Sequence, residues 1–367
     1  MLAPAAMELL GAGHCLDRWR REVSQTPSMT FLRSACARQR RGFPRRAPVV
    51  PRAFLACLSL WVACQSPTPS PKARPVLVPS APVDARPDGQ FALAVDPFAF
   101  DPDLFSRMAP PLPGDWLSVH PEPGQTFFQY VMAVPVRRIS ARGTVVIQPV
   151  GPFGARESAL LDRLVEMTAA FFQIPVRLAP PLALPSKGMR TLDDAPFAVQ
   201  YRTGVIEREV LLPRLPSDAL CYLGVTMADL YPGPSWNYVF GEASYRDRVG
   251  IFSLARYSAR FWGQAETAKS ERRLLLRAFK VLAHEAGHML SMLHCTAYKC
   301  LMNGSNSLAE LDREPEWLCP VCLKKLQWNV GLDVRAHYQQ QRALFERAGL
   351  KDSAAWADRR LAQLGIR

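Results

Sequence analysis

The chain has 367 residues, of which 49% are hydrophobic and 21% charged, so it can bury a sizeable core and is not disordered as a whole. Its net charge of +13 is unevenly placed, because residues 1–80 hold twelve basic and three acidic residues. The remaining chain is only mildly basic. This argues against a nucleic-acid-binding domain, whose positive charge should lie on the folded part.

The first 64 residues predict a leader rather than a folded domain. The Arg-rich stretch before residue 52 has no hydrophobic period and is expected to be disordered. The apolar run at 53–64 is too short to span a membrane and has the length of a signal-peptide core. It ends in a small residue and then Cys64, as bacterial lipoprotein signals do, so we expect a lipid on Cys64 that anchors the protein at the cell envelope. A buried apolar helix is the alternative.

This apolar run begins past residue 50, whereas a signal peptide is roughly 15–30 residues long. We therefore expect translation to begin at Met29, Val49 or Val50 rather than at Met1. Residues 65–115 follow as a Pro-rich tether and an irregular lead-in, with no core-forming content in the Pro- and Ser-rich part.

Residues 116–350 have the periodicity of a mixed α/β domain, and residues 351–367 that of a C-terminal helix. The first two strands and the helix between them form a βαβ unit, which implies parallel strands and a right-handed crossover. The expected strands are 144–150, 175–178, 220–226, 236–240 and 250–254, and the expected helices are 156–173, 271 to about 291, 334–348 and 354–364.

The helix that begins at Glu271 carries the run His-Glu-Ala-Gly-His at 284–288. His284 and His288 are one i,i+4 step apart, so they project from one face and can offer two imidazoles to a single metal ion. Glu285 stands beside them as a base. His294 can join them only if the helix stops near Ser291 and the chain doubles back. Ordinary core or surface histidines are the alternative.

Four cysteines follow the histidines and suit a closed tetrahedral zinc site, which would tie the loop after His294 to a later helix. Two disulfides are the alternative, which an exported protein would favour. Because His294 is adjacent to the first cysteine, the structural site would also fix the catalytic ligand. The cysteines are Cys295, Cys300, Cys319 and Cys322.

The whole motif, from the two helical histidines through His294-Cys295 and Cys300-x-Met302 to the final C-x-x-C, resembles the archaemetzincins, a branch of the metzincin metallopeptidases. The resemblance covers residues 143–344. It departs at Ser291, where metzincins have Gly. It implies an α/β (α+β) fold: a five-stranded twisted mixed sheet with an active-site helix, then a C-terminal helical subdomain tied by the zinc of the four cysteines.

The resemblance also implies a zinc peptidase with two zinc ions, one catalytic at the three histidines and one structural at the four cysteines. Water activated by zinc would lose a proton to Glu285 and attack the scissile carbonyl. Met302 would lie beneath the metal as the Met-turn methionine. The antiparallel edge strand would bind the substrate backbone by β-augmentation, unless it is an ordinary edge strand. That strand would comprise Asn237, Tyr238, Val239, Phe240 and Gly241.

Two functions of different class follow from the sequence. One is a monomeric peptidase that acts on peptides or unfolded protein segments. The other is an inactive metzincin-fold protein that serves as a binding or scaffold module at the cell envelope. Glu285 favours the enzyme, because a binding module needs no base there, and Ser291 favours the alternative. Reduced thiolates would suit the cytoplasm, which is the second expectation for location.

Overall fold

The computed structural model describes residues 75–76, 100–192 and 199–366. The predicted leader, its signal-like run, Cys64 and most of the tether lie outside the described residues. Among the helices of the described ranges, none has the length and apolar character needed to cross a bilayer. The boundaries predicted at residues 115 and 350 stay predictions.

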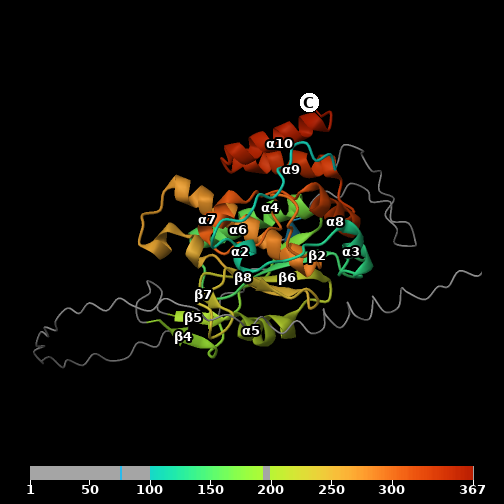
Figure 1. The fold of residues 1–367 in the computed structure, drawn as a ribbon. Helices are drawn as coiled ribbons and strands as arrows, with labels where there is room; N and C mark the ends of the chain where they lie inside the picture. Colours follow the sequence, from blue (N-terminus) through green and yellow to red (C-terminus); the bar gives the residue numbers. More distant parts are fainter. Residues whose placement is uncertain (1–74, 77–99, 193–198, 367) are drawn as a thin grey trace, which may run out of the picture. The chain divides into compact units, whose positions relative to one another are not determined.

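A mixed sheet lies at the centre, with the strand order β1-β3-β2-β6-β9-β8 (Figure 1). Strands β3, β2, β6 and β9 are parallel, and β1 and β8 are the antiparallel edges. Apart from the two-residue β1, this is the five-stranded mixed sheet expected from the sequence. Strands β6 and β9 are buried at every position, as in a sheet covered on both faces. The strands are β1 Pro75–Val76, β2 Thr144–Pro149, β3 Val176–Leu178, β6 Ala219–Thr226, β8 Gly241–Ala243 and β9 Val249–Ser253.

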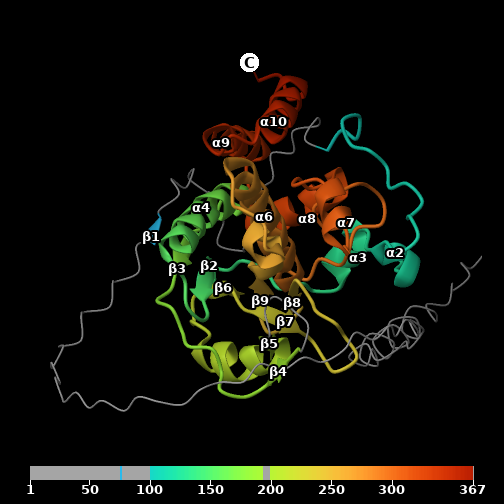
Figure 2. The ribbon, with the colours of Figure 1, turned by 90° about the vertical axis from the view of Figure 1, so that its left-hand side faces the viewer.

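Two long helices, α4 (Ala155–Phe172) and α6 (Ala268–Met289), cover one face of this sheet (Figure 2). Helix α4 connects the parallel strands β2 and β3, as predicted for the βαβ unit. Helix α6 begins at a capping box in which Thr267 and Ser270 each accept the backbone N–H of the other. The two helices pack through Phe171 and Phe279, whose ring centroids are 5.5 Å apart.

The opposite face of the sheet carries a second, three-stranded sheet and a short run of helical turns, which lie on the side away from α4 and α6 in both views (Figures 1 and 2). This layer is not predicted from the amino-acid pattern, because its strands are only three or four residues long and show no clear alternation. Its members are β4 Met189–Thr191, β5 Val199–Arg202, β7 Asp229–Tyr231, α5 Thr203–Val205, the π-helix η1 Ile206–Leu211 and the 3₁₀-helix η2 Leu212–Arg214.

Shorter elements complete the molecule around α6. Helices α9 and α10 pack against each other, and Trp356 of α10 stacks on Trp317 with ring centroids 3.9 Å apart. Trp356 therefore belongs to the same buried core as α6. The remaining elements are α2 Trp116–Val119, α3 Phe127–Met132, the 3₁₀-helices η3 Ala255–Tyr257 and η4 Ala259–Trp262, α7 Leu308–Arg313, α8 Pro320–Val330, α9 Val334–Arg347 and α10 Lys351–Gln363.

The antiparallel edge strand begins later than predicted. The expected strand at 236–240 is not formed, and β8 at Gly241–Ala243 pairs with β9 instead. The second sheet holds the preceding residues: Arg190 donates to the carbonyl of Asn237 at 2.8 Å, and the N–H of Val239 donates to the carbonyl of Leu230 at 3.0 Å. The sequence placed the edge strand a few residues too early. Of the five residues assigned to it, Asn237, Tyr238, Val239 and Phe240 precede β8, and Gly241 begins it.

Candidate metal centres

Helix α6 ends at Met289, early enough for the chain to turn back and bring His294 to the other two histidines. The N–H of Met292 donates to the carbonyl of Gly287 at 3.1 Å, and the N–H of Ser291 donates to that of His288 at 2.7 Å. These two bonds form a Schellman motif, which needs a left-handed residue at its centre. Ser291 has φ +66° and takes that place. The predicted bend near Ser291 is confirmed.

Ser291 supplies contacts that glycine would lack. Its hydroxyl accepts the N–H of Val136 at 3.1 Å and donates to the carbonyl of Tyr245 at 3.1 Å. A left-handed conformation costs a non-Gly residue about 1–2 kcal/mol, and each hydrogen bond returns about 1 kcal/mol. The departure from the metzincin pattern is therefore compensated locally and does not disturb the site.

The bend brings His284, His288 and His294 together, with their ligand atoms all within 4.8 Å of one another. The Nδ1 of His284 lies 2.9 Å from the carbonyl of Leu301, and that of His288 lies 2.7 Å from the carbonyl of Met292. A carbonyl can only accept, so both Nδ1 atoms carry the proton and both Nε2 atoms keep a lone pair. This is the tautomer that a metal ligand needs.

Glu122 provides the corresponding partner for His294, and the sequence analysis missed it. Its carboxylate oxygens lie 2.8 and 3.1 Å from the Nδ1 of His294, and it also accepts the indole N–H of Trp116 at 2.9 Å. Burial alone would raise the pKa of Glu122, but the hydrogen bond and charge of His294 outweigh it and lower that pKa. No sequence spacing could have indicated this residue, because 172 positions separate it from His294.

Burial sets the protonation of the site. Burial and the nearby His294 lower the pKa of His284 to about 3, and burial lowers that of His288 well below its usual range. Both imidazoles are therefore neutral near pH 7, as metal ligands must be. Burial, with a smaller effect of Glu242, raises the pKa of Glu285 to about 8, and the positive charge of a zinc ion held by the histidines would lower it again.

Two glycines allow close packing around α6. A Cβ at Gly287 would lie 2.5 Å from the sulfur of Met302, so this methionine packs directly beneath the helix that carries the histidines. A Cβ at Gly241 would lie 2.9 Å from Oε1 of Glu285. The edge strand β8 therefore runs directly beside the carboxylate of Glu285.

The four cysteines form a second cluster, whose sulfur atoms also lie within 4.8 Å of one another. All four are free and buried, and the sulfurs of Cys295 and Cys319 are 3.7 Å apart. A tetrahedron with 2.3 Å zinc–sulfur bonds has edges of about 3.8 Å, whereas a disulfide requires about 2.05 Å. Hydrogen bonds from the neighbouring thiols, Cys300 first, lower the pKa of Cys295. The geometry fits zinc and not the alternative pair of disulfides.

The two clusters share a short piece of backbone. His294 and Cys295 are adjacent, and the N–H of Cys295 donates to the carbonyl of Met302 at 2.7 Å. The side chain of Asn303 donates to the carbonyl of Cys295 at 2.6 Å. The loop that carries the third histidine is thus fixed by the cysteine cluster on one side and by the methionine turn on the other.

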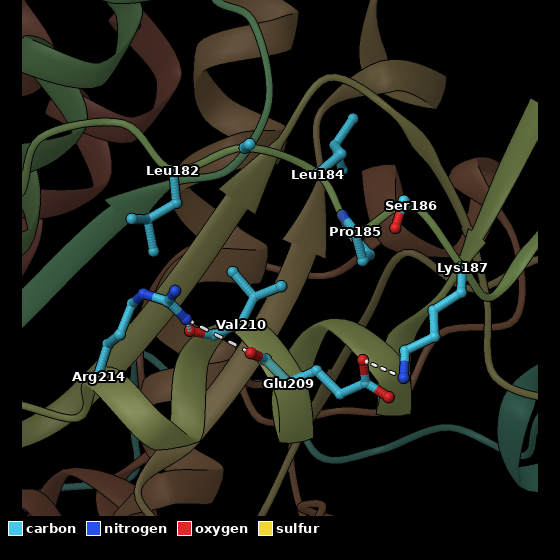
Figure 3. A pocket seen from close by; sticks show the side chains of 9 residues that line it. Leu182, Leu184, Pro185, Ser186, Lys187, Glu209, Val210 and Arg214 are labelled. Carbon is cyan, nitrogen blue, oxygen red and sulfur yellow. Dashed lines mark hydrogen bonds and ion pairs between the residues drawn. The ribbon is translucent and has the colours of Figure 1, made fainter.

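A cavity of about 250 Å³ contains neither cluster (Figure 3). Leu182 and Leu184 line one part of it, and Lys187 forms an ion pair with Glu209 at its edge. Arg214 is held by the carbonyl oxygens at the end of η1. The lining of this cavity includes no His or Cys, so we assign no chemistry to the cavity.

Comparisons with known proteins identify relatives of this chain. Residues 218–328 match the profile of Peptidase family M54. The chain is 35% identical over 272 residues to archaemetzincin-2 of Macaca fascicularis and to that of Homo sapiens, and each alignment covers 66% of this chain and 75% of the relative. The solved structure of an archaemetzincin from Methanopyrus kandleri aligns at 25% identity with a TM-score of 0.42, over 53% of this chain and 99% of that one.

The family match and the two clusters define a zinc-dependent metallopeptidase. The chain belongs to the archaemetzincin family. The predicted family, enzyme class and zinc cofactor are confirmed. The alternative of an inactive scaffold is not favoured, and Ser291, which had suggested it, adopts the bend that the active arrangement needs.

Proposed function

We propose that His284, His288 and His294 hold the catalytic zinc and that Glu285 is the general base in peptide-bond hydrolysis. The observation that carries this proposal is the convergence of three imidazoles whose Nδ1 atoms all have hydrogen-bond partners. Three imidazole ligands leave one position of a tetrahedral zinc open, as catalytic zinc sites require.

Zinc supplies Lewis acidity at such a site, because it lowers the pKa of water towards 7 and polarises a carbonyl group. Glu285 takes a proton from the attacking water, whose oxygen bonds to the scissile carbonyl carbon. Glu285 then gives this proton to the amide nitrogen, the C–N bond breaks, and a carboxylic acid and an amine are released. Glu285 is 8% exposed, so bulk water has little access to the proton while it is held.

The substrate is a peptide or protein segment that adds to the free edge of β8. This antiparallel strand pairs with β9 on one side only, and its open side presents backbone groups for β-augmentation. Gly241 supports this placement, since its missing side chain lets β8 pass close to Glu285. The preceding residues Asn237 to Phe240 form the approach to that edge.

A second zinc at Cys295, Cys300, Cys319 and Cys322 has a structural role, since a closed four-thiolate site leaves no position for substrate. Its location ties the turn after α6 to the start of α8, where the sulfur of Cys319 accepts the N–H of Cys322.

The substitution Glu285→Ala tests the proposal. The variant should keep the zinc content of the wild type and lose cleavage of a quenched fluorescent peptide library by at least about 100-fold, the usual contribution of a general base. Glu166→Gln serves as a control, because this exposed carboxylate on α4 pairs with Arg347 and with no residue of the site. Equal cleavage by wild type and Glu285→Ala at equal zinc content would remove the proposed mechanism.

For location, we propose that Cys64 carries a lipid that anchors the protein at the cell envelope, because it ends an apolar run of signal-peptide length. Labelling cells with radioactive palmitate should mark the wild type and not Cys64→Ser. An unlabelled wild type would leave the cytoplasm as the expected location.

A further inference from the structure

Tyr245 lies beside the histidine cluster, in contact with His288. Its ring centroid is 5.1 Å from that of His288, with the two ring planes at 69°. His288 is 6% exposed, whereas Tyr245 is 41% exposed. The phenol ring therefore contacts the nearly buried imidazole of His288 in an edge-to-face arrangement and is itself partly exposed.

The backbone of Tyr245 is held from two directions. Its carbonyl accepts the hydroxyl of Ser291 at the bend after α6. The preceding Ser244 fixes the turn, because its N–H donates to the carbonyl of Val249 at 2.9 Å and its hydroxyl accepts the N–H of Asp247 at 3.0 Å. Because the backbone of Tyr245 is fixed and its ring contacts His288, the side chain can be positioned for a reaction.

The hydroxyl of Tyr245 has no hydrogen-bond partner among the residues that the structure describes. Two other donors near the site are already used: the indole N–H of Trp116 goes to Glu122, and the hydroxyl of Tyr130 goes to the carbonyl of Leu290. Burial, followed by the charges of Glu285 and Glu122, raises the pKa of the Tyr245 phenol, so that it stays protonated as a donor.

We propose that Tyr245 is a catalytic residue that donates a hydrogen bond to the oxyanion of the tetrahedral intermediate. This inference rests on the proposed function and names a further group for the same reaction. When water adds to the scissile carbonyl carbon, the carbonyl oxygen gains the negative charge, and a fixed O–H donor stabilises it. The tyrosine keeps its proton and forms no covalent bond.

The edge strand leads the substrate to this donor. Tyr245 follows the last residue of β8, Ala243, by two positions. A peptide that pairs with the free edge of β8 therefore runs next to the turn that carries Tyr245. Removal of one oxyanion donor typically lowers kcat by about 100- to 1000-fold.

The test is Tyr245→Phe in the full-length, zinc-loaded protein, since phenylalanine keeps the ring on His288 and removes only the hydroxyl. The substrate is one quenched fluorescent peptide chosen from a library cleaved by the wild type. We expect kcat to fall about 100- to 1000-fold, with KM and zinc content unchanged, because the lost interaction exists only in the transition state. Tyr201→Phe, on β5 in the second sheet, is the matched control and should keep the wild-type kcat.

Inhibitor binding separates this role from a structural one. A phosphinic analogue of the same peptide carries a tetrahedral P–O⁻ group, so its inhibition constant should rise by the same factor as kcat falls. An unchanged kcat, an unchanged inhibition constant, or a loss of zinc in Tyr245→Phe would each overturn the oxyanion role. These outcomes differ from equal cleavage by wild type and Glu285→Ala, which would overturn the proposed function itself.

Discussion

Glu122→Gln removes a negative charge from the catalytic site while nearly keeping its shape. In the wild type the nearer carboxylate oxygen lies 2.8 Å from the Nδ1 of His294. A glutamine oxygen can still accept that N–H, so the ring keeps its orientation, but the imidazole becomes a weaker electron donor to zinc. Substitution of such a partner typically lowers metal affinity about 10- to 100-fold, which corresponds to about 1.4–2.8 kcal/mol.

The glutamine variant should lie near the lower limit of this range, and Glu122→Ala near the upper limit. Alanine also removes the hydrogen bond that orients the ring, and it leaves the indole N–H of Trp116 without its acceptor. The expected order of zinc affinity is wild type, then Glu122→Gln, then Glu122→Ala. This order separates the loss of charge from the loss of orientation.

Zinc affinity can be measured directly by titration of the protein against a colorimetric chelator. The catalytic ion should be released first, because four thiolates hold the structural ion more tightly than three imidazoles hold the other. Glu166→Gln is again the control, as its side chain is 54% exposed on α4. If both Glu122 variants kept the wild-type affinity within about twofold, His294 would not depend on Glu122 for its basicity or its orientation.

Three further predictions concern Gly287 of α6, Ser291 at its end and the buried Glu207 of η1. Gly287→Ala should lower the free energy of unfolding in urea by about 1–3 kcal/mol, since its Cβ would meet the sulfur of Met302 at 2.5 Å; an unchanged value would mean that the methionine moves aside freely. Ser291→Gly should stay within about 1 kcal/mol of the wild type, whereas Ser291→Ala, which keeps the left-handed strain and loses both hydrogen bonds, should be less stable than Ser291→Gly by about 1 kcal/mol. Burial, followed by the charge of Glu242, raises the pKa of Glu207 to about 8. The stability that the protonated group contributes is therefore fully present below about pH 4.5 and is lost as the pH rises through 8. Glu207→Gln mimics that form and should unfold at higher urea than the wild type at pH 8.5, with a smaller difference at pH 5.5; a difference that does not change with pH would contradict the assignment.

Much of the fold and of the metal sites could be predicted because the signals are local. The helical period of α6 and the βαβ unit follow from apolar spacing, and the histidines of α6 face one way because they are one helical turn apart. The bend at Ser291 was inferred from the position of His294 alone. Glu122 and Tyr245 carry no such signal, since they reach the histidines from distant elements through tertiary packing.

The misplaced edge strand has a different cause. Residues 236–240 contain aromatic and β-branched side chains, which favour a strand, whereas Gly241-Glu242-Ala243 have low strand propensity. The hydrogen bonds from Arg190 and from the N–H of Val239 tie the first stretch to the second sheet. Residues 241–243 therefore pair with β9 although their strand propensity is lower. The contacts with the neighbouring sheet override local propensity at this edge.

The two zinc sites should be thermodynamically coupled through the short loop that they share. Cys319→Ser removes one of four thiolates and should abolish the structural zinc, which leaves the turn that carries His294 less constrained. Because that imidazole then has to be ordered by the catalytic ion itself, we expect the catalytic affinity to fall about 10-fold, or about 1.4 kcal/mol.

Thermodynamic linkage between the two zinc sites tests this prediction. If the structural ion raises the catalytic affinity by a given factor, the catalytic ion must raise the structural affinity by the same factor. His288→Ala, which removes a ligand on α6 and leaves the shared loop intact, should therefore weaken the structural site to the extent that Cys319→Ser weakens the catalytic one. Unchanged catalytic affinity in Cys319→Ser would mean that the side chain of Asn303, which donates to the carbonyls of Cys295 and Tyr298 at 2.6 and 3.0 Å, holds the loop without help from the metal.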